Sequence, residues 1–372
     1  MKDDSASYYD SREFTELLAV YENMLAEGSS VYFDSMDLAN IAGYYTASGE
    51  LDKSDAAIEY GLNLHPSDPD ILIAKAGNLL MRGRLEEAMV ISESINDPEN
   101  QELLYLRGAL ALADNDVDLA DSYFTQAVEL SDNDPGMLND IIVKFLDNRN
   151  FDLCQKWLDM ALVMSPDSRN FIELQADLYF DTGRMDTAIE WYNHLLDEFA
   201  YDTYYWEQLG RIYYEKNQFP EARECFEFIE AIEPGNKSAL MMKSGCLFSM
   251  ELWDQALTIY KQLLKDDPDS YSLRYYCGRC LYEQGNYDEA LEYFTDTQTY
   301  LMQDPETPQD LYTELYTYMA KSCLNLGHNE KARMYLYEGL AIDPDDEDLK
   351  KLAPIILPDE EAGLFTDNNA KK

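Results

Sequence analysis

Basic side chains are scarce in this sequence. Its 372 residues include 28 Lys and Arg against 73 Asp and Glu, which gives a net charge of -45 and an isoelectric point near 4.1. The phosphates of a nucleic acid or of an anionic membrane surface would be repelled by such a chain. We therefore expect no nucleic-acid ligand, and we interpret the acidity either as an aid to solubility or as a means of attracting a basic partner.

Histidine and long apolar stretches are also in short supply. The three histidines, His65, His194 and His328, lie far apart in the sequence, so neither a histidine metal cluster nor a Cys-His dyad is predicted. No run of 18 apolar residues occurs, and the first five residues lack the apolar stretch of a secretory signal. These features predict a cytoplasmic protein without membrane insertion.

The six cysteines show no spacing typical of a disulfide framework, which suits a reducing compartment. Cys277 and Cys280 form a CxxC motif, a spacing used by redox enzymes and by zinc sites. The alternative is that both thiols pack in a helical core, which the register of Gly278 between them favours. No metal ligand set is predicted, but a redox or metal-responsive regulator remains a second alternative.

What the sequence does contain is a helical hairpin pattern, clearest in residues 203–237. A first apolar or small stripe has the i, i+3, i+4, i+7 spacing of an amphipathic helix and consists of Trp206, Leu209, Gly210 and Tyr213. After a polar break a second stripe ends before Pro234 and consists of Phe219, Ala222, Phe226 and Ile229. Gly210 and Ala222 are small where two helices would approach, and Phe226 can fill the space beside them.

The same pattern recurs along the chain. Its most regular feature is a small residue in each second helix, here called the anchor: Ser54, Ala88, Ala120, Cys154, Ala188, Ala222, Ala256, Ala290 and Ala332. Six of the eight steps between anchors are 34 residues, and the others are 32 and 42. Eight of the nine residues twelve positions before an anchor are small, Ile142 being the exception, and five of the nine residues twelve positions after are proline. These are internal repeats.

The Trp, Leu-Gly, Tyr, Ala, Phe and Pro positions between Trp206 and Pro234 resemble the signature of the tetratricopeptide repeat. The resemblance implies an all-α, right-handed superhelical solenoid of about nine helix-turn-helix repeats over residues 35–346. Residues 1–34 are then an N-terminal segment with a capping half-repeat helix. Residues 347–372 are a short C-terminal capping helix followed by a disordered tail.

The resemblance also implies that the first helices line a concave groove, into which residues fifteen, eleven and eight positions before each anchor point. In the second half of the chain these positions are rich in aromatic and cationic side chains, the residue types that most often anchor interfaces. The predicted partner-binding residues are Phe180, Arg211, Tyr214, Phe248, Tyr275, Arg279, Tyr282 and Lys321. The alternative is that these rings pack between repeats while the cations offset nearby acid.

These features predict a non-enzymatic scaffold that binds a protein or peptide segment in its groove, without a cofactor. An alternative is an adaptor or complex subunit that docks a basic partner on an acidic convex face. Carboxylates are so frequent that no pair indicates acid-base catalysis. Residues 132–136 faintly resemble a calcium loop but lack its full ligand set, so we interpret them as a turn between repeats.

Overall fold

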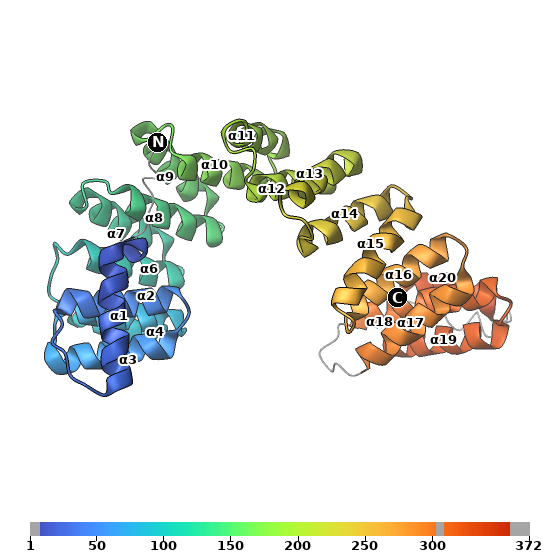
Figure 1. Cartoon of the computed structure of the whole chain (residues 1–372), viewed down its shortest axis with the longest axis horizontal. Coiled ribbons are helices and arrows are strands. Elements are labelled where there is room, and N and C mark those ends of the chain that lie inside the picture. The colour runs from blue at the N-terminus through green and yellow to red at the C-terminus, as the bar shows by residue number, and fades with distance from the viewer. Residues whose placement is uncertain (1–7, 303–308, 358–372) are drawn as a thin grey trace, which may run out of the picture. The chain divides into compact units, whose positions relative to one another are not determined.

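The computed structural model describes residues 8–302 and 309–357, and within these ranges it contains twenty α-helices, one 3-10 turn and no strand (Figure 1). The all-α prediction is therefore confirmed. None of the helices in the described ranges combines the length and the apolar character that crossing a membrane requires. The predicted tail, 359–372, lies outside the described residues.

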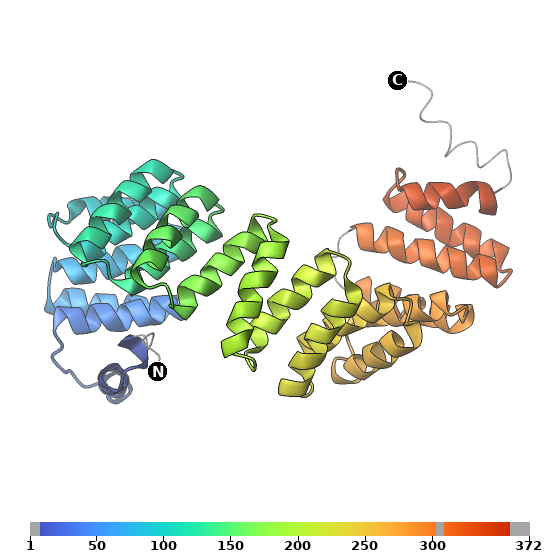
Figure 2. The ribbon, with the colours of Figure 1, turned by 90° about the horizontal axis from the view of Figure 1, so that it is seen from above.

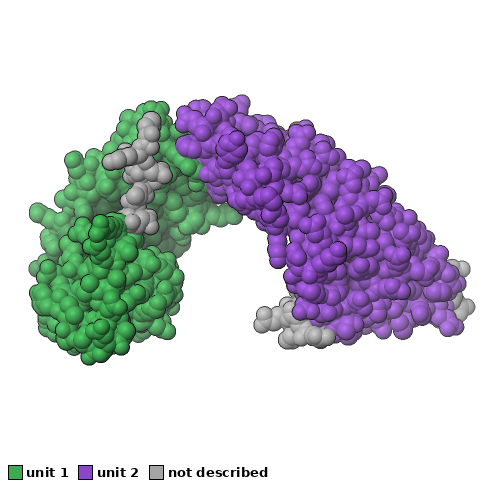
Figure 3. Space-filling view, in the orientation of Figure 1, with its two compact units in different colours: residues 1–184 green, residues 185–372 purple. Residues whose placement is uncertain are grey.

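The chain divides into two units, residues 1–184 and 185–372 (Figure 3). The described elements of unit 1 are η1 Tyr8–Asp10, α1 Arg12–Glu27, α2 Ser35–Ala47, α3 Leu51–Leu64, α4 Pro69–Met81, α5 Leu85–Ser94, α6 Gln101–Ala113, α7 Val117–Leu130, α8 Pro135–Asp147, α9 Phe151–Met164 and α10 Arg169–Asp181. Those of unit 2 are α11 Met185–Glu198, α12 Thr203–Glu215, α13 Phe219–Ile232, α14 Lys237–Ser249, α15 Trp253–Asp266, α16 Tyr271–Glu283, α17 Tyr287–Leu301, α18 Gln309–Asn325, α19 Asn329–Ile342 and α20 Glu347–Ile356. Even-numbered helices from α2 to α18 are the first helices of the repeats.

The predicted repeat register is confirmed by burial. All nine anchors lie in the second helices and have no exposed surface. Three first helices carry glycine twelve positions before the anchor, where a Cβ atom would lie only 2.6 Å from a phenylalanine ring. These glycine–phenylalanine pairs are Gly108 with Phe124, Gly210 with Phe226 and Gly278 with Phe294. The close helix approach inferred for Gly210 and Ala222 is thus present in the structure.

The turn inside each repeat has a feature that the hairpin pattern did not predict. The residue five positions before every anchor has a positive φ, which ranges from 57° to 81°. These residues are Gly49, Gly83, Asn115, Arg149, Gly183, Asn217, Glu251, Gly285 and Gly327. Glycine and asparagine adopt this left-handed conformation most readily, so Arg149 and Glu251 are the costly members of the series.

Helices at both ends cover the repeat cores. In Figures 1 and 2, α1 crosses α2 at a steep angle, and it buries Phe14, Tyr21 and Met24 in the first core. At the other end, Leu349 and Leu352 of α20 pack in one cluster with residues of α18 and α19. The half-repeat origin suggested for the N-terminal helix stays a prediction, but its capping contacts, like those of α20, are present.

Candidate binding surface

The structure places Arg279 of α16 inside an aromatic cage. Its guanidinium carbon lies 4.1 Å from the ring centre of Tyr318, 5.2 Å from that of Phe248 and 5.7 Å from that of Tyr275. Nη1 donates a hydrogen bond to Tyr275 Oη at 3.0 Å and forms an ion pair with Glu314 Oε1 at 2.9 Å. The Arg279 side chain is only 17% exposed, whereas that of Glu314 is 48% exposed. Cation–π contacts and one ion pair therefore join α14, α16 and α18.

Tyr318 of α18 is the centre of this group. Its ring makes an edge contact with Tyr282 at 5.2 Å between ring centres, and Lys321 Nζ lies 5.0 Å above it. The resulting Arg279 cluster consists of Phe248, Tyr275, Arg279, Tyr282, Glu314, Tyr318 and Lys321. Five of the predicted partner-binding residues are thus brought together on three first helices of unit 2.

Electrostatics keep Arg279 and its two tyrosine partners in one charge state near neutral pH. Burial alone would lower the pKa of Arg279, but Tyr275, Tyr318 and Glu314 outweigh burial and raise it. Burial also raises the pKa values of Tyr275 and Tyr318 above the usual range for tyrosine. The rings therefore remain neutral and the guanidinium remains charged, which is the combination that cation–π attraction requires.

The other three predicted residues lie elsewhere. Arg211 of α12 is exposed, and its Nη1 donates to Gln208 on the same helix at 3.1 Å. The Tyr214 ring contacts Phe219 and faces Gly245 of α14, where a Cβ atom would lie 3.7 Å from the ring. Phe180 is half-buried on α10 in unit 1.

Sequence reasoning missed Glu314 and Tyr318. Together with Lys321 they have the i, i+4, i+7 spacing of one helix face. Tyr318 stands fourteen residues before its anchor, one position from the set expected to face the groove. A search of α18 for an aromatic residue beside an acid on the face of Lys321 could have found both.

The CxxC motif belongs to the core. The side chains of Cys277 and Cys280 have no exposed surface, and burial raises the pKa of each thiol to about 12. Redox and zinc chemistry need an accessible thiolate, and these two sites provide neither access nor the charged form. In the segment 132–136, Asp134 instead caps α8, where its carboxylate accepts the Met137 amide at 2.8 Å.

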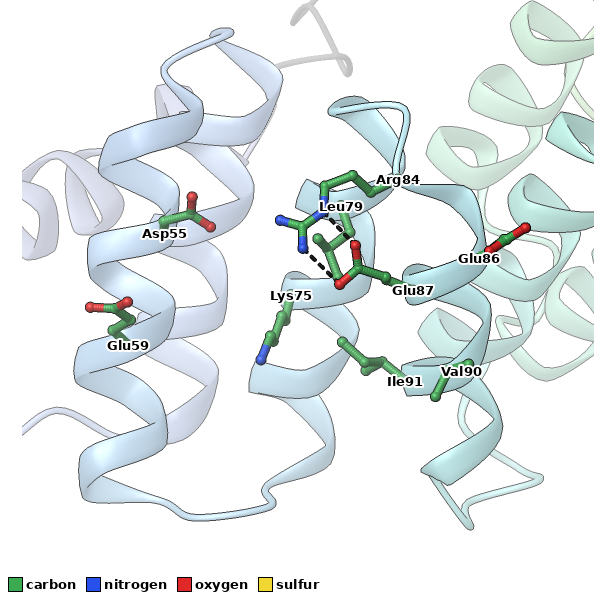
Figure 4. A pocket seen from close by; sticks show the side chains of 9 residues that line it. All are labelled: Asp55, Glu59, Lys75, Leu79, Arg84, Glu86, Glu87, Val90 and Ile91. Atoms are coloured by element: carbon green, nitrogen blue, oxygen red, sulfur yellow. Dashed lines mark hydrogen bonds and ion pairs between the residues drawn. The ribbon is translucent and has the colours of Figure 1, made fainter.

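Unit 1 also contains an open cavity of about 600 Å³ between α3, α4 and α5 (Figure 4). The lining residues are Asp55, Glu59, Lys75, Leu79, Arg84, Glu86, Glu87, Val90 and Ile91. Arg84 and Glu87 form a two-bond ion pair on its wall, at 2.6 and 2.7 Å. The lining combines four carboxylates and two cations with three apolar side chains.

Comparisons with known proteins find repeat families along the chain. Tetratricopeptide-repeat models match residues 144–203 and 313–346, and a model described as anaphase-promoting complex, cyclosome, subunit 3 matches residues 215–297. Anaphase-promoting complex subunit CDC16 of Saccharomyces cerevisiae is 24% identical over 228 residues, which are 59% of this chain. The chain spans about a quarter of that relative, 26% of its length.

Solved structures of repeat proteins are similar as well. One is the C-terminal part of a TPR repeat-containing protein from Cytophaga hutchinsonii, with a TM-score of 0.55, 17% identity and coverage of 66% of this chain and 97% of that one. Another is a tetratricopeptide repeat protein from Parabacteroides merdae, with a TM-score of 0.46, 17% identity and coverage of 68% of this chain and 96% of that one. The first supports the fold, and the repeat register, the buried anchors and the model matches agree with it. The chain therefore contains tetratricopeptide repeats.

Proposed function

We propose that this protein is a non-catalytic scaffold whose Arg279 cluster binds a segment of a partner protein. The observation that supports this most directly is the gathering of rings and two cations on three successive first helices. Aromatic residues and arginine are enriched among the residues that dominate interface energies. The rings offer apolar area to the segment, and the cations favour a segment that carries carboxylates.

Lys321 and Arg279 differ in how each can bind a ligand carboxylate. Lys321 is half-buried, and its charge contributes to lowering the pKa of Asp348 on α20. Arg279 is already paired, but its partner Glu314 is about half exposed and can turn away without unpacking the guanidinium. A ligand carboxylate can therefore bind Lys321 directly, or replace Glu314 on Arg279. The exchange puts one carboxylate in place of another, so the largely buried guanidinium is not left unpaired.

The test needs a defined ligand. Partners captured by the parent protein from its source cells are mapped to one segment with overlapping peptides, and the affinity of that peptide is measured by calorimetry. We expect Lys321→Met to weaken binding about tenfold and Arg279→Met about thirtyfold, which corresponds to about 2 kcal/mol. Arg12→Met is the control, because Arg12 is an exposed arginine of α1. Unchanged affinity in both cluster variants, with unchanged helix content, contradicts the proposal.

A second function is supported by the comparisons and by the charge. Similarity to a subunit of the anaphase-promoting complex favours a role as a subunit or adaptor within a larger assembly. A net charge of -45 suits docking of a basic partner on an acidic surface. This proposal predicts that the protein elutes with a large complex when native extracts are fractionated. It also predicts that Arg279→Met and Lys321→Met leave that elution unchanged.

A further inference from the structure

The turn Tyr8–Asp10 lies against the first helix of the first repeat. The Tyr9 ring makes edge contacts with Phe14 of α1 and Tyr44 of α2, with ring centres 4.9 and 5.6 Å apart. The Ser11 amide donates to the Tyr8 carbonyl at 3.0 Å and so joins the turn to α1. Figure 2 shows the turn in dark blue, beside α1 and next to α2.

Gly43 of α2 makes room for this ring. A Cβ atom on Gly43 would lie 2.8 Å from Tyr9 Oη, and apart from Tyr9 no described neighbour would come within 4 Å of it. Gly43 stands eleven positions before its anchor, the same register position as Arg279 in unit 2. Gly77 has this position in the next repeat, and nothing lies within 4 Å of a Cβ atom there. The space over Gly43 is therefore used by Tyr9 alone, and we call Gly43, Tyr44 and Phe14 the Tyr9 seat.

Acidic residues lie on the same side of unit 1. Burial raises the pKa of Tyr9, and the nearby carboxylates of Glu102 on α6 and Asp140 on α8 raise it further. The phenol is therefore neutral near these carboxylates. A phenol with an additional negative charge would be repelled there.

The contact is small. The turn has three residues, Tyr8 is 43% exposed, and the rings of Tyr8 and Tyr9 both pack against Phe14, with ring centres 5.4 and 4.9 Å away. Segments with few buried contacts open at low free-energy cost, far below the cost of global unfolding. The tether nevertheless gives the turn an effective concentration in the millimolar range at the seat, which an external ligand must overcome.

We propose that the Tyr9 seat is a binding site for a tyrosine-bearing segment and that Tyr8–Asp10 occupies it as a tethered ligand of the same chain. The seat is on a first helix of unit 1, so this proposal is independent of the Arg279 cluster in unit 2. An external segment with an unmodified tyrosine binds there by displacing Tyr9.

The test uses the full chain and a labelled synthetic peptide of residues 5–14, followed by fluorescence polarisation. In the parent protein the seat is filled, whereas Tyr9→Ala empties it without removing the turn. We expect the peptide to bind the Tyr9→Ala variant at least tenfold more tightly than the parent. A peptide with alanine in place of its second tyrosine should bind neither protein.

Two glycine variants identify the seat. Adding Gly43→Leu to Tyr9→Ala should abolish peptide binding, because the leucine fills the space of the ring. Adding Gly77→Leu places the same side chain at the same register position of the next repeat and should leave binding unchanged. Circular dichroism checks that both double variants keep their helix content.

Three results would overturn the proposal. Failure of the peptide to bind the Tyr9→Ala variant at millimolar concentration makes the turn a structural cap only. Equal loss of binding in the Gly43→Leu and Gly77→Leu backgrounds places the peptide elsewhere. A parent dimer that Gly43→Leu dissociates, seen by analytical ultracentrifugation, assigns the turn to the seat of a second copy.

Discussion

Glycines in three first helices set the distance to the paired second helices. At Gly108, Gly210 and Gly278 the missing side chain admits a phenylalanine ring from the partner helix of the same repeat. Gly77, also in a first helix, faces no side chain within 4 Å. The same residue type therefore has different roles at register positions that differ by one.

We expect Gly210→Ala to destabilise unit 2. The new Cβ atom would lie 2.6 Å from Phe226 Cζ, and overpacking of this kind costs about 1–3 kcal/mol. This exceeds the gain of about 0.5–1 kcal/mol from replacing a helical glycine. Urea unfolding followed by circular dichroism measures the difference. Gly77→Ala is the control and should be stabilising, so a gain in both variants argues against the close approach.

Glu251 and Arg149 are the large side chains among the left-handed turn residues. A left-handed conformation costs a residue with a side chain about 1–2 kcal/mol. Glycine removes this strain, but it also makes the unfolded chain more flexible, which offsets part of the gain in stability. We expect Glu251→Gly to raise the free energy of unfolding by about 0.5–1 kcal/mol. Glu251→Ala removes the same charge but keeps the Cβ atom. A gain of equal size in the alanine variant would assign the effect to charge.

Successive first helices of unit 1 carry carboxylates that repel one another. Burial raises the pKa of Glu102 on α6, and Asp70 on α4 and Asp140 on α8 raise it further. Burial likewise raises the pKa of Asp140, although Lys144 opposes the shift. A carboxylate with a raised pKa binds protons more tightly in the folded state than in the unfolded state. Its contribution to stability therefore falls as the pH rises from the ordinary pKa of the carboxyl to the raised pKa of the folded state.

Neutralising Glu102 should relieve this repulsion. We expect Glu102→Gln to raise the midpoint of thermal unfolding at pH 7, because the penalty grows as the pH rises above the ordinary pKa of glutamate. The gain should disappear below about pH 4, where the ordinary glutamate is protonated in both states. Glu59→Gln is the control, since Glu59 is exposed on α3 of the same unit. A gain that does not change with pH, or an equal gain in the control, would contradict this account.

The repeat elements followed from the sequence because each depends on a local pattern. A small anchor, a small residue twelve positions earlier and a proline after the second helix are all readable from spacing. The pairing of Arg279 with Glu314 could not be read from the repeat spacing, because Glu314 lies 35 residues away across the one step of 42 residues. The Tyr9 seat was missed for a similar reason, since Gly43 reads as one more small residue until the position of Tyr9 is known.

At the scale of the whole molecule, charge is the property that separates the two proposed functions. The chain carries -45 on 372 residues, so its field opposes any acidic segment that approaches from solution. A segment bound at the Arg279 cluster depends instead on rings and on short-range contacts with Lys321 and Arg279. A basic partner on an acidic surface depends on many exposed charges, which salt screens.

The dependence of binding on ionic strength therefore distinguishes the two proposed functions. The Debye length falls from about 10 Å at 0.1 M salt to about 3 Å at 1 M, so added salt removes long-range repulsion and attraction but changes partly buried contacts less. If the captured partner binds the Arg279 cluster, its affinity should change by less than about threefold over this range, and its association rate should rise as repulsion is screened. If it docks on an acidic surface, affinity should fall more than about tenfold, mainly through slower association. Surface plasmon resonance separates the two rates, and Lys321→Met, measured at each salt concentration, shows whether the salt-resistant part of the affinity belongs to the cluster.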